Sequence, residues 1–483
     1  MSNKDNTKEQ VAGGFLWKFG ERISAQLVTF VVSLVLARLL TPEYYGAISL
    51  VTVFITFANV FVSGGFGNAL IQKKDTDELD YSSVFYGSLA VSVVLYIIIF
   101  FFAPSFAVLY NMPELTPVFR VMGLRLLVAA VNSVQHAYVS KHMMFRKFFW
   151  STLIGTVLSG VVGVGLAYAN FGIWALVAQY MVNTTVDTIV LFITVPWRPR
   201  LLFSLKRLRG LFSYGWKLLV SELINTGYTE IRSLIVGIKY SSADLAYYNK
   251  GQSFPRLVVV NINASIQSVL FPVMAKAQDD VKAVRQMARR SIRIGSFIVV
   301  PMVLGLGLVA KPFVALLLTE KWLECVPYLQ LYCVFYCLMP IQTANLQAIK
   351  AVGRSDIYLK MEVIKKALGI ALLLIAVPFG TFAIAVSAVV SNVIAALMNI
   401  IPNHRLLQYT WKEQAADYFN AIIPLVAMSV VVTGLQILPI TTLALFALQV
   451  LLGAATYILV SHVMKLESYN YVLGLAMKFL KRR

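Results

Sequence analysis

Charged residues are scarce in this chain. Only 13% of its 483 residues are Asp, Glu, Lys or Arg, whereas 59% are hydrophobic. Soluble domains carry about 25% charged residues, so this composition excludes a soluble globular protein. Long apolar runs recur along the whole sequence, and about 20 apolar residues suffice for a helix that crosses a bilayer. The composition therefore predicts an all-α, polytopic membrane protein.

Acidic residues, cysteine and histidine are also few. The chain has 22 Asp and Glu against 42 Lys and Arg, 3 Cys and 4 His. In a membrane protein the positive-inside rule accounts for much of the basic excess, so no nucleic-acid partner is expected. The histidines lack metal-ligand spacing. We interpret Cys325, Cys333 and Cys337 as apolar packing residues, with a metal or redox role as the alternative. No metal site and no cofactor are predicted.

The apolar runs number about fourteen, an even number that puts both termini on one side of the membrane. Basic residues collect in alternate loops, as at 73–74, 141–147 and 198–210, while the intervening loops hold few. Such loops face the cytoplasm. We therefore expect a multi-pass protein with both termini cytoplasmic. The basic, amphipathic segment 275–293 is predicted to form a separate surface helix before the next span.

A weak internal repeat divides the chain. Trp17 and Trp216 each open a long apolar run that leads to a tyrosine pair, Tyr44-Tyr45 and Tyr247-Tyr248. A period of roughly 200 residues is typical of transporters built from two related halves. The repeat predicts an N-terminal lobe, a basic cytoplasmic linker, a C-terminal lobe, and two further helices with a basic cytoplasmic tail: 1–197, 198–210, 211–404 and 405–483.

Charged side chains inside the spans are the candidate functional groups, because each is costly in a membrane. We expect five cations to line a cavity for an anionic cargo: Lys18, Arg22, Arg125, Lys217 and Arg256. Arginine binds phosphate oxygens through two parallel hydrogen bonds. The alternatives are that Lys18 and Arg22 reach the membrane surface and that Arg125 pairs with an acid. Four acids are candidates for coupling transport to H⁺ or Na⁺: Glu21, Asp187, Glu222 and Glu230.

Neutral polar residues share helix faces with these charges. Asn132 and His136 follow Arg125, Gln179 and Asn183 precede Asp187, and Asn263 and Gln267 follow Arg256, all at helical spacing. For the amides, the alternative to a cavity is hydrogen bonding between helices, which contributes about 0.6 kcal/mol per pair.

Six sequence blocks carry a family resemblance: LARLLTPEYYGAISLV, GFGNALIQKKDTDELDYSSVF, WRPRLLFS, YYNKGQ, VLFPVMAKAQDD and LQAIKAVGRSDIYLK. Together they resemble Wzx-type polysaccharide flippases, nearest to the colanic acid exporter-like subgroup. These belong to the multidrug/oligosaccharidyl-lipid/polysaccharide exporter superfamily. The resemblance implies two six-helix lobes in a V around a central cavity, plus two C-terminal helices. Related lipid II flippases carry cavity cations on the first, second and eighth helices, but here the second helix, 47–62, has no basic residue.

The resemblance also implies a function. The cargo would be undecaprenyl-pyrophosphate-linked oligosaccharide repeat units, moved across the bacterial inner membrane for surface polysaccharide biosynthesis. Membrane lipids, and other polysaccharide assembly proteins, would be the remaining partners. Alternating access would drive the movement without ATP, since the chain has no G-x-x-x-x-G-K-[ST] motif.

Three other functions stay open. A multidrug exporter of the same superfamily would favour an acidic cavity for cationic drugs, whereas the predicted one is basic. A membrane polysaccharide polymerase or ligase would need larger outer loops. The last alternative is an inert scaffold for polysaccharide assembly.

Overall fold

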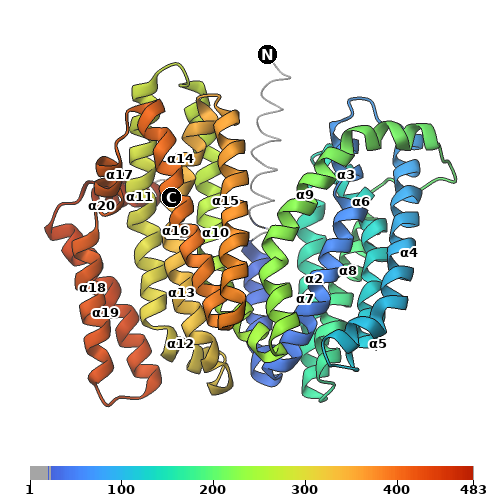
Figure 1. Cartoon of the computed structure of the whole chain (residues 1–483), viewed down its shortest axis with the longest axis horizontal. Coiled ribbons are helices and arrows are strands. Elements are labelled where there is room, and N and C mark those ends of the chain that lie inside the picture. The colour runs from blue at the N-terminus through green and yellow to red at the C-terminus, as the bar shows by residue number, and fades with distance from the viewer. Residues whose placement is uncertain (1–19, 21–22, 482–483) are drawn as a thin grey trace. The chain divides into compact units, whose positions relative to one another are not determined.

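The computed structural model describes residue 20 and residues 23–481, and every regular element in this part of the chain is helical (Figure 1). A bilayer has no water to satisfy open backbone groups, so spanning segments must be helices or closed barrels. The prediction of an all-α, polytopic membrane protein is confirmed. The predicted site residues Lys18, Glu21 and Arg22 lie outside the described residues.

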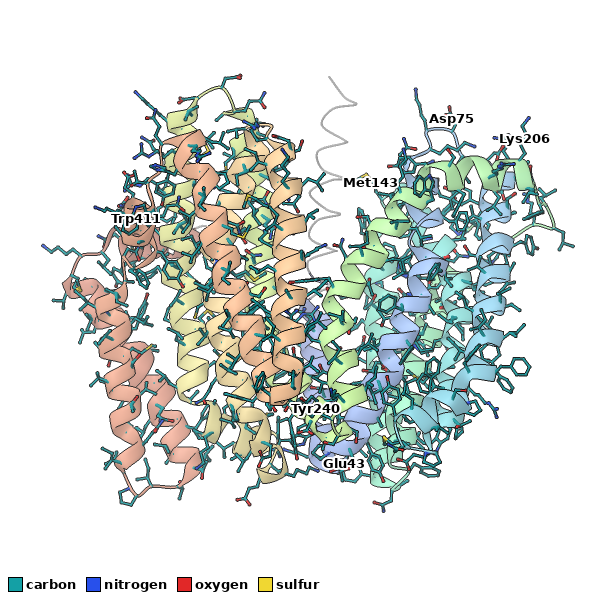
Figure 2. All side chains as sticks on the ribbon, viewed as in Figure 1. Glu43, Asp75, Met143, Lys206, Tyr240 and Trp411 are labelled. Carbon is teal, nitrogen blue, oxygen red and sulfur yellow. The ribbon has the colours of Figure 1, made fainter. Side chains whose placement is uncertain are left out.

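The chain divides into two compact units, residues 1–246 and 247–483. The first holds the helix Ile23–Leu39 and then α2 (Pro42–Ser63), α3 (Phe66–Gln72), α4 (Glu78–Leu109), α5 (Leu115–Gly123), α6 (Arg125–Lys141), α7 (Phe145–Tyr168), α8 (Ile173–Thr194) and α9 (Leu205–Lys239). Successive spans alternate in direction, with α2 and α3 forming one span and α5 and α6 another (Figure 2). Figure 2 shows Asp75, Met143 and Lys206 at one end of this unit and Glu43 and Tyr240 at the other.

The helix α10 (Ser242–Lys276) leads from the first unit into the second. There follow α11 (Val281–Leu308), α12 (Ala310–Leu317), η1 (Glu320–Cys325), α13 (Val326–Cys337), α14 (Met339–Ala351), α15 (Ser355–Ala376), η2 (Val377–Phe379), α16 (Thr381–Leu407), α17 (Trp411–Tyr418), α18 (Ile422–Gly434), η3 (Leu435–Ile437), α19 (Thr442–Val463) and α20 (Glu467–Lys481).

Ten helices of the described chain are long and apolar enough to cross a membrane, some of them built from two adjoining elements. The pair α17 and α18, bent by 42°, would be an eleventh. The helix Ile23–Leu39 is shorter, and charged residues interrupt the apolar stretches of α9 and α15, as at Lys360, Glu362 and Lys365 in α15. The chain is thus a multi-pass membrane protein, and the count of fourteen stays a prediction.

The basic segment 198–210 is bound to the first unit along its length. The backbone N–H groups of Arg200 and Ser204 donate to Ser82 Oγ and Ser83 Oγ at the start of α4, over 3.2 and 2.9 Å. The guanidinium of Arg207 lies 3.3 Å from Asp77 Oδ2. The backbone N–H of Asp80, which Asp77 accepts as a helix cap, holds the pKa of Asp77 below its usual range.

The attachment of the segment 198–210 to the first unit gives a different division of the chain from the lobes that the repeat predicts. The first compact unit includes the segment 198–210 and also α9, which packs against α2, α3 and α4. The repeat instead divides the chain near residue 197 and assigns α9 to the C-terminal lobe. Compact unit and repeat are different divisions of the chain, and the lobe boundaries stay a prediction.

The segment 275–293 does not form a separate surface helix, contrary to the prediction. Residues from Val281 onward are the first turns of the spanning helix α11. Three of its four arginines are paired with acids of α17: Arg285 lies 2.5 Å from Glu413, and Arg289 and Arg293 lie 2.7 and 2.5 Å from Asp417. Because these pairs compensate the charge, a basic segment can continue directly into an apolar span.

Close backbone contacts between helices depend on glycine. A Cβ atom added to Gly46 on α2 would lie 1.7 Å from the carbonyl oxygen of Ser242, at the start of α10. A Cβ atom on Gly215 of α9 would lie 2.5 Å from the carbonyl oxygen of Gly65. Backbone atoms cannot turn aside as a side chain can, so only glycine fits at these crossings.

We expect Gly46→Ala to lower the thermal unfolding temperature of the purified protein, because overpacking costs about 1–3 kcal/mol. Unfolding in detergent, followed by tryptophan fluorescence, measures the effect. The matched control is Gly165→Ala on α7, where an added Cβ atom meets nothing within 4 Å. Equal unfolding temperatures for the two variants would contradict the predicted crossing.

Candidate functional site

A polar cavity of about 470 Å³ lies inside the first unit, among α2, α3, α6 and α8. One stripe of side chains on each of the long helices forms its walls. Its polar lining residues are Thr52, Thr56, Asn59, Ser63, Asn68, Arg125, Asn132, Ser133, His136, Ser140, Tyr180 and Thr184. Hydroxyl and amide groups in such number inside a membrane protein indicate a wet cavity or a binding site.

Arg125 is the cation of this cavity. It lies near the middle of the span Leu115–Lys141, where the break between α5 and α6 occurs. Its Nε donates to Thr184 Oγ1 at 3.2 Å, and its guanidinium lies 5.1 Å from the centre of the Tyr180 ring. In the described part of the chain no carboxylate forms an ion pair with Arg125. Its positive charge is therefore held by neutral groups and the cavity, which suits an anionic ligand.

Asp187 on α8 faces the same stripe of α6. Asn132 donates to Asp187 Oδ2 at 2.8 Å, and His136 Nε2 lies 3.5 Å from the same oxygen. The Asp187 side chain is 16% exposed and that of His136 47% exposed. A carboxylate and an imidazole in contact can share and exchange a proton, so this pair is a candidate proton-binding site.

Four polar atoms in and beside the cavity have no hydrogen-bond partner in the described structure although they are buried: Thr52 Oγ1, Asn59 Oδ1, Asn132 Oδ1 and Asp187 Oδ1. Buried polar atoms are nearly always paired, and an unpaired one costs about 1–3 kcal/mol. Their concentration around one cavity indicates that water or a ligand occupies it.

The amides of two polar stripes form hydrogen bonds between helices, and Asn263, Gln267 and Gln347 also line a separate cavity of about 570 Å³. Asn183 Nδ2 lies 3.4 Å from Ser159 Oγ on α7, so it contributes to the packing of α7 and α8 rather than to the cavity. In the second unit Thr343 donates to Asn263 Oδ1 at 2.5 Å, and Gln347 donates to Gln267 Oε1 at 3.1 Å. For these amides the interhelical alternative fits the contacts.

The remaining predicted residues lie elsewhere in the described structure. Lys217 and Glu222 are exposed on α9, and Glu230 is half-buried on the same helix. Arg256 is exposed on α10, in the second unit. The 470 Å³ cavity thus brings together Arg125, His136 and Asn132, with Asp187 beside them, and none of these four other residues lines it.

Sequence reasoning missed the contribution of α2. Thr52, Thr56, Asn59 and Ser63 form one wall of the cavity, and their spacing of three to four residues marks one helix face. The spacing of the hydroxyl and amide side chains on this helix was the signal that could have found them.

Comparison with known proteins identifies the family. The model of the family described as polysaccharide biosynthesis protein matches residues 35–327, which is more than half of the chain. The chain belongs to this family. Family membership confirms the predicted association with polysaccharide biosynthesis.

Curated relatives match along most of the sequence. The chain is 25% identical over 390 residues to the succinoglycan biosynthesis transport protein ExoT of Rhizobium meliloti (strain 1021), covering 80% of this chain and 77% of the relative. It is 26% identical over 402 residues to the lipopolysaccharide biosynthesis protein WzxC of Escherichia coli (strain K12), covering 82% and 80%. These names agree with the prediction of a transporter rather than an enzyme.

Solved structures share the fold. The lipid II flippase MurJ in an inward closed conformation matches 93% of this chain and 98% of its own, with a TM-score of 0.75 and 16% identity. An inward-facing multidrug resistance transporter of the MATE family matches 81% and 98%, with a TM-score of 0.61 and 15% identity. This chain therefore shares its fold with these two proteins.

The wet cavity predicts a pattern of thiol reactivity on α6. Cysteine introduced at Ser133, which lines the cavity, should react with a small polar methanethiosulfonate reagent several times faster than cysteine at Val134, which is fully buried. Labelling of membranes, read by mass shift, measures both rates. The native Cys325, Cys333 and Cys337 are buried and should stay unlabelled. Equal labelling at positions 133 and 134 would contradict an accessible cavity.

Proposed function

We propose that this protein moves undecaprenyl-pyrophosphate-linked oligosaccharide repeat units across the bacterial inner membrane for surface polysaccharide biosynthesis. Family membership supports a role in polysaccharide biosynthesis, and the relative from Rhizobium meliloti is named a transport protein. The fold is that of a lipid II flippase, whose cargo by name is also a lipid. Membrane lipids and other polysaccharide assembly proteins complete the proposed partners.

The observation that carries this proposal is the Arg125 guanidinium in the cavity of the first unit, which has no ion pair in the part of the chain that the structure describes. A pyrophosphate bears about two negative charges, and even one charged side chain costs on the order of 2.5–3.5 kcal/mol at the centre of a membrane. A guanidinium already inside the span offsets this cost by hydrogen bonds to phosphate oxygens. His136, when protonated, adds a second positive charge on the same face of α6.

Further cations would complete the phosphate site as the transporter changes conformation. Lys18, Arg22, Lys217 and Arg256 stay candidates for this role. Alternating access between two related lobes, without ATP, is the proposed mechanism. Both termini lie in the cytoplasm in this proposal, since the basic loops alternate along the chain.

Asp187 is the proposed coupling residue. Its carboxylate contacts Asn132 and His136 beside the cavity that holds Arg125. A proton taken up by the Asp187–His136 pair would change the charge next to the cargo site and so shift the preference between conformations. Glu21, Glu222 and Glu230 stay the alternative coupling residues, and Na⁺ the alternative ion.

We expect Arg125→Ala to reduce surface polysaccharide on the order of tenfold or more, because hydrogen bonds to a charged group contribute about 1.5–3 kcal/mol. Arg125→Lys should restore only part of the export, since lysine lacks the planar fork. Export is measured in a deletion strain, with membrane levels of each variant checked by immunoblot.

The matched control is Lys74→Gln, which removes one positive charge from an exposed position outside the cavity. It should export as well as the wild type. If Arg125→Ala also exports normally at normal membrane levels, Arg125 is not the phosphate ligand.

The coupling role is tested with Asp187→Asn, which keeps the size of the side chain but removes its titratable proton. In proteoliposomes with a pH-sensitive dye inside, cargo-dependent proton movement should be lost while cargo binding is retained. Asp279→Asn, an exposed acid outside the cavity, is the control and should behave as the wild type. Proton movement at the wild-type rate in Asp187→Asn would assign coupling to another acid.

The multidrug alternative is disfavoured by the same cavity. Its arginine would repel a cationic drug, and the nearby carboxylate of Asp187 is already engaged by Asn132 and His136. A polymerase, a ligase or an inert scaffold would not require Arg125 for transfer of lipid-linked cargo between leaflets.

A further inference from the structure

A second charged cavity, of about 800 Å³, lies in the second unit between the first turns of α11 and the helix α20. Figure 1 shows α20 and α17 beside α11. Its polar walls include Arg289, Arg290 and Arg293 of α11, and Ser468, Asn470 and Tyr471 of α20. Nothing in the proposed transport function uses this cavity.

The charges around this cavity are not fully compensated. Arg289 and Arg293 both pair with Asp417, which is only 1% exposed, and Arg293 also lies 2.6 Å from Glu467. Arg290 differs from them. Its guanidinium lies 4.0 Å from the centre of the Tyr471 ring, and it has no ion pair in the described part of the chain. An exposed arginine is thus held in place by stacking, with its hydrogen-bond donors left for a ligand.

The helices around this cavity are typical of a membrane surface. The spanning helix α19 ends at Val463, and α20 begins only four residues later, at Glu467. Tyr469 and Val472 of α20 pack on the apolar core of the unit, while Leu473 and Met477 are exposed. A helix with an apolar side that follows a span so closely lies along the membrane surface. The first turns of α11 lie at the same end of the bundle.

The remaining lining residues are the polar Gln286 and Glu467 and the apolar Ala283, Met287 and Ile294. Met287 and Ile294 of α11 line the cavity next to its arginines. A site for free phosphate would need only the polar part and a far smaller volume. A phosphate group followed by apolar chain fits both parts of the lining.

We propose that this cavity binds the headgroup of an anionic phospholipid, with the guanidinium of Arg290 on the phosphate and Met287 and Ile294 against the adjoining acyl chain. Basic pockets between helices at the membrane surface are suited to such headgroups. The bound lipid would hold α20 against α11 and so attach the C-terminal end of the chain to one leaflet.

The test is native mass spectrometry of the purified full-length protein, with phosphatidylglycerol and phosphatidylcholine offered together. We expect the wild type to retain phosphatidylglycerol and Arg290→Gln to bind it at least about tenfold more weakly, since an arginine–phosphate contact is lost. Tyr471→Ala, which removes the stacking partner, should weaken binding in the same direction. Unfolding temperatures in phosphatidylcholine alone should stay equal, which shows that the variants fold.

The matched control is Lys282→Gln, which removes one positive charge from an exposed position of α11 outside the cavity. It should retain phosphatidylglycerol as the wild type does. Equal loss in Lys282→Gln and Arg290→Gln, or no loss in Arg290→Gln, would overturn the site. Displacement of the lipid by inorganic phosphate at matched concentration would show a site for free phosphate and overturn the lipid assignment. No cargo is used, so the result is independent of the proposed transport.

Discussion

The cost of a polar group in a membrane is the constraint on which this structure depends. Helices satisfy the backbone, and each polar side chain then needs a partner on another helix or access to water. In the second unit Asn345 donates to Gln414 at 2.8 Å, and Asn403 donates to Asn345 at 2.9 Å, all three fully buried. In the first unit the polar groups around Arg125 line a cavity of about 470 Å³ instead. The cavity separates residues placed for a ligand from residues that hold helices together.

The ion pairs between distant segments also reflect the cost of a polar or charged group in a membrane protein. Asp417 of α17 accepts from Arg289 and Arg293 of α11, and the hydroxyl of Tyr409 donates to it as well. Arg207 and Lys73 converge in the same way on Asp80, which is fully buried at the start of α4. A charge that would be costly to bury alone is tolerated when an opposite charge lies beside it. The ion pairs thereby attach an amphipathic segment and a basic linker to the helices beside them.

The candidate site was only partly predictable from sequence. Arg125, Asn132 and His136 share one face of α6, and helical spacing alone places them together. The contact of Asp187 with that face depends on how α8 packs against α6. Gln179 and Asn183 precede Asp187 at helical spacing. The amide of Asn183, however, contacts α7 instead. Spacing defines a face of one helix, but it does not say which neighbour that face meets.

The sequence by itself determined the class of this protein: an all-α membrane protein of polysaccharide biosynthesis, with polar groups concentrated on a few helix faces. Composition and hydropathy suffice for the helical membrane class because the bilayer allows few solutions. The role in polysaccharide biosynthesis followed from the resemblance of six sequence blocks to a known family. Only the tertiary structure decided which polar residues share a cavity, that segment 198–210 and α9 belong to the first compact unit, and that α11 begins with paired arginines. These features depend on contacts between residues far apart in the chain, such as Arg289 with Asp417. No local pattern encodes such a contact, because it is selected by the packing of whole helices.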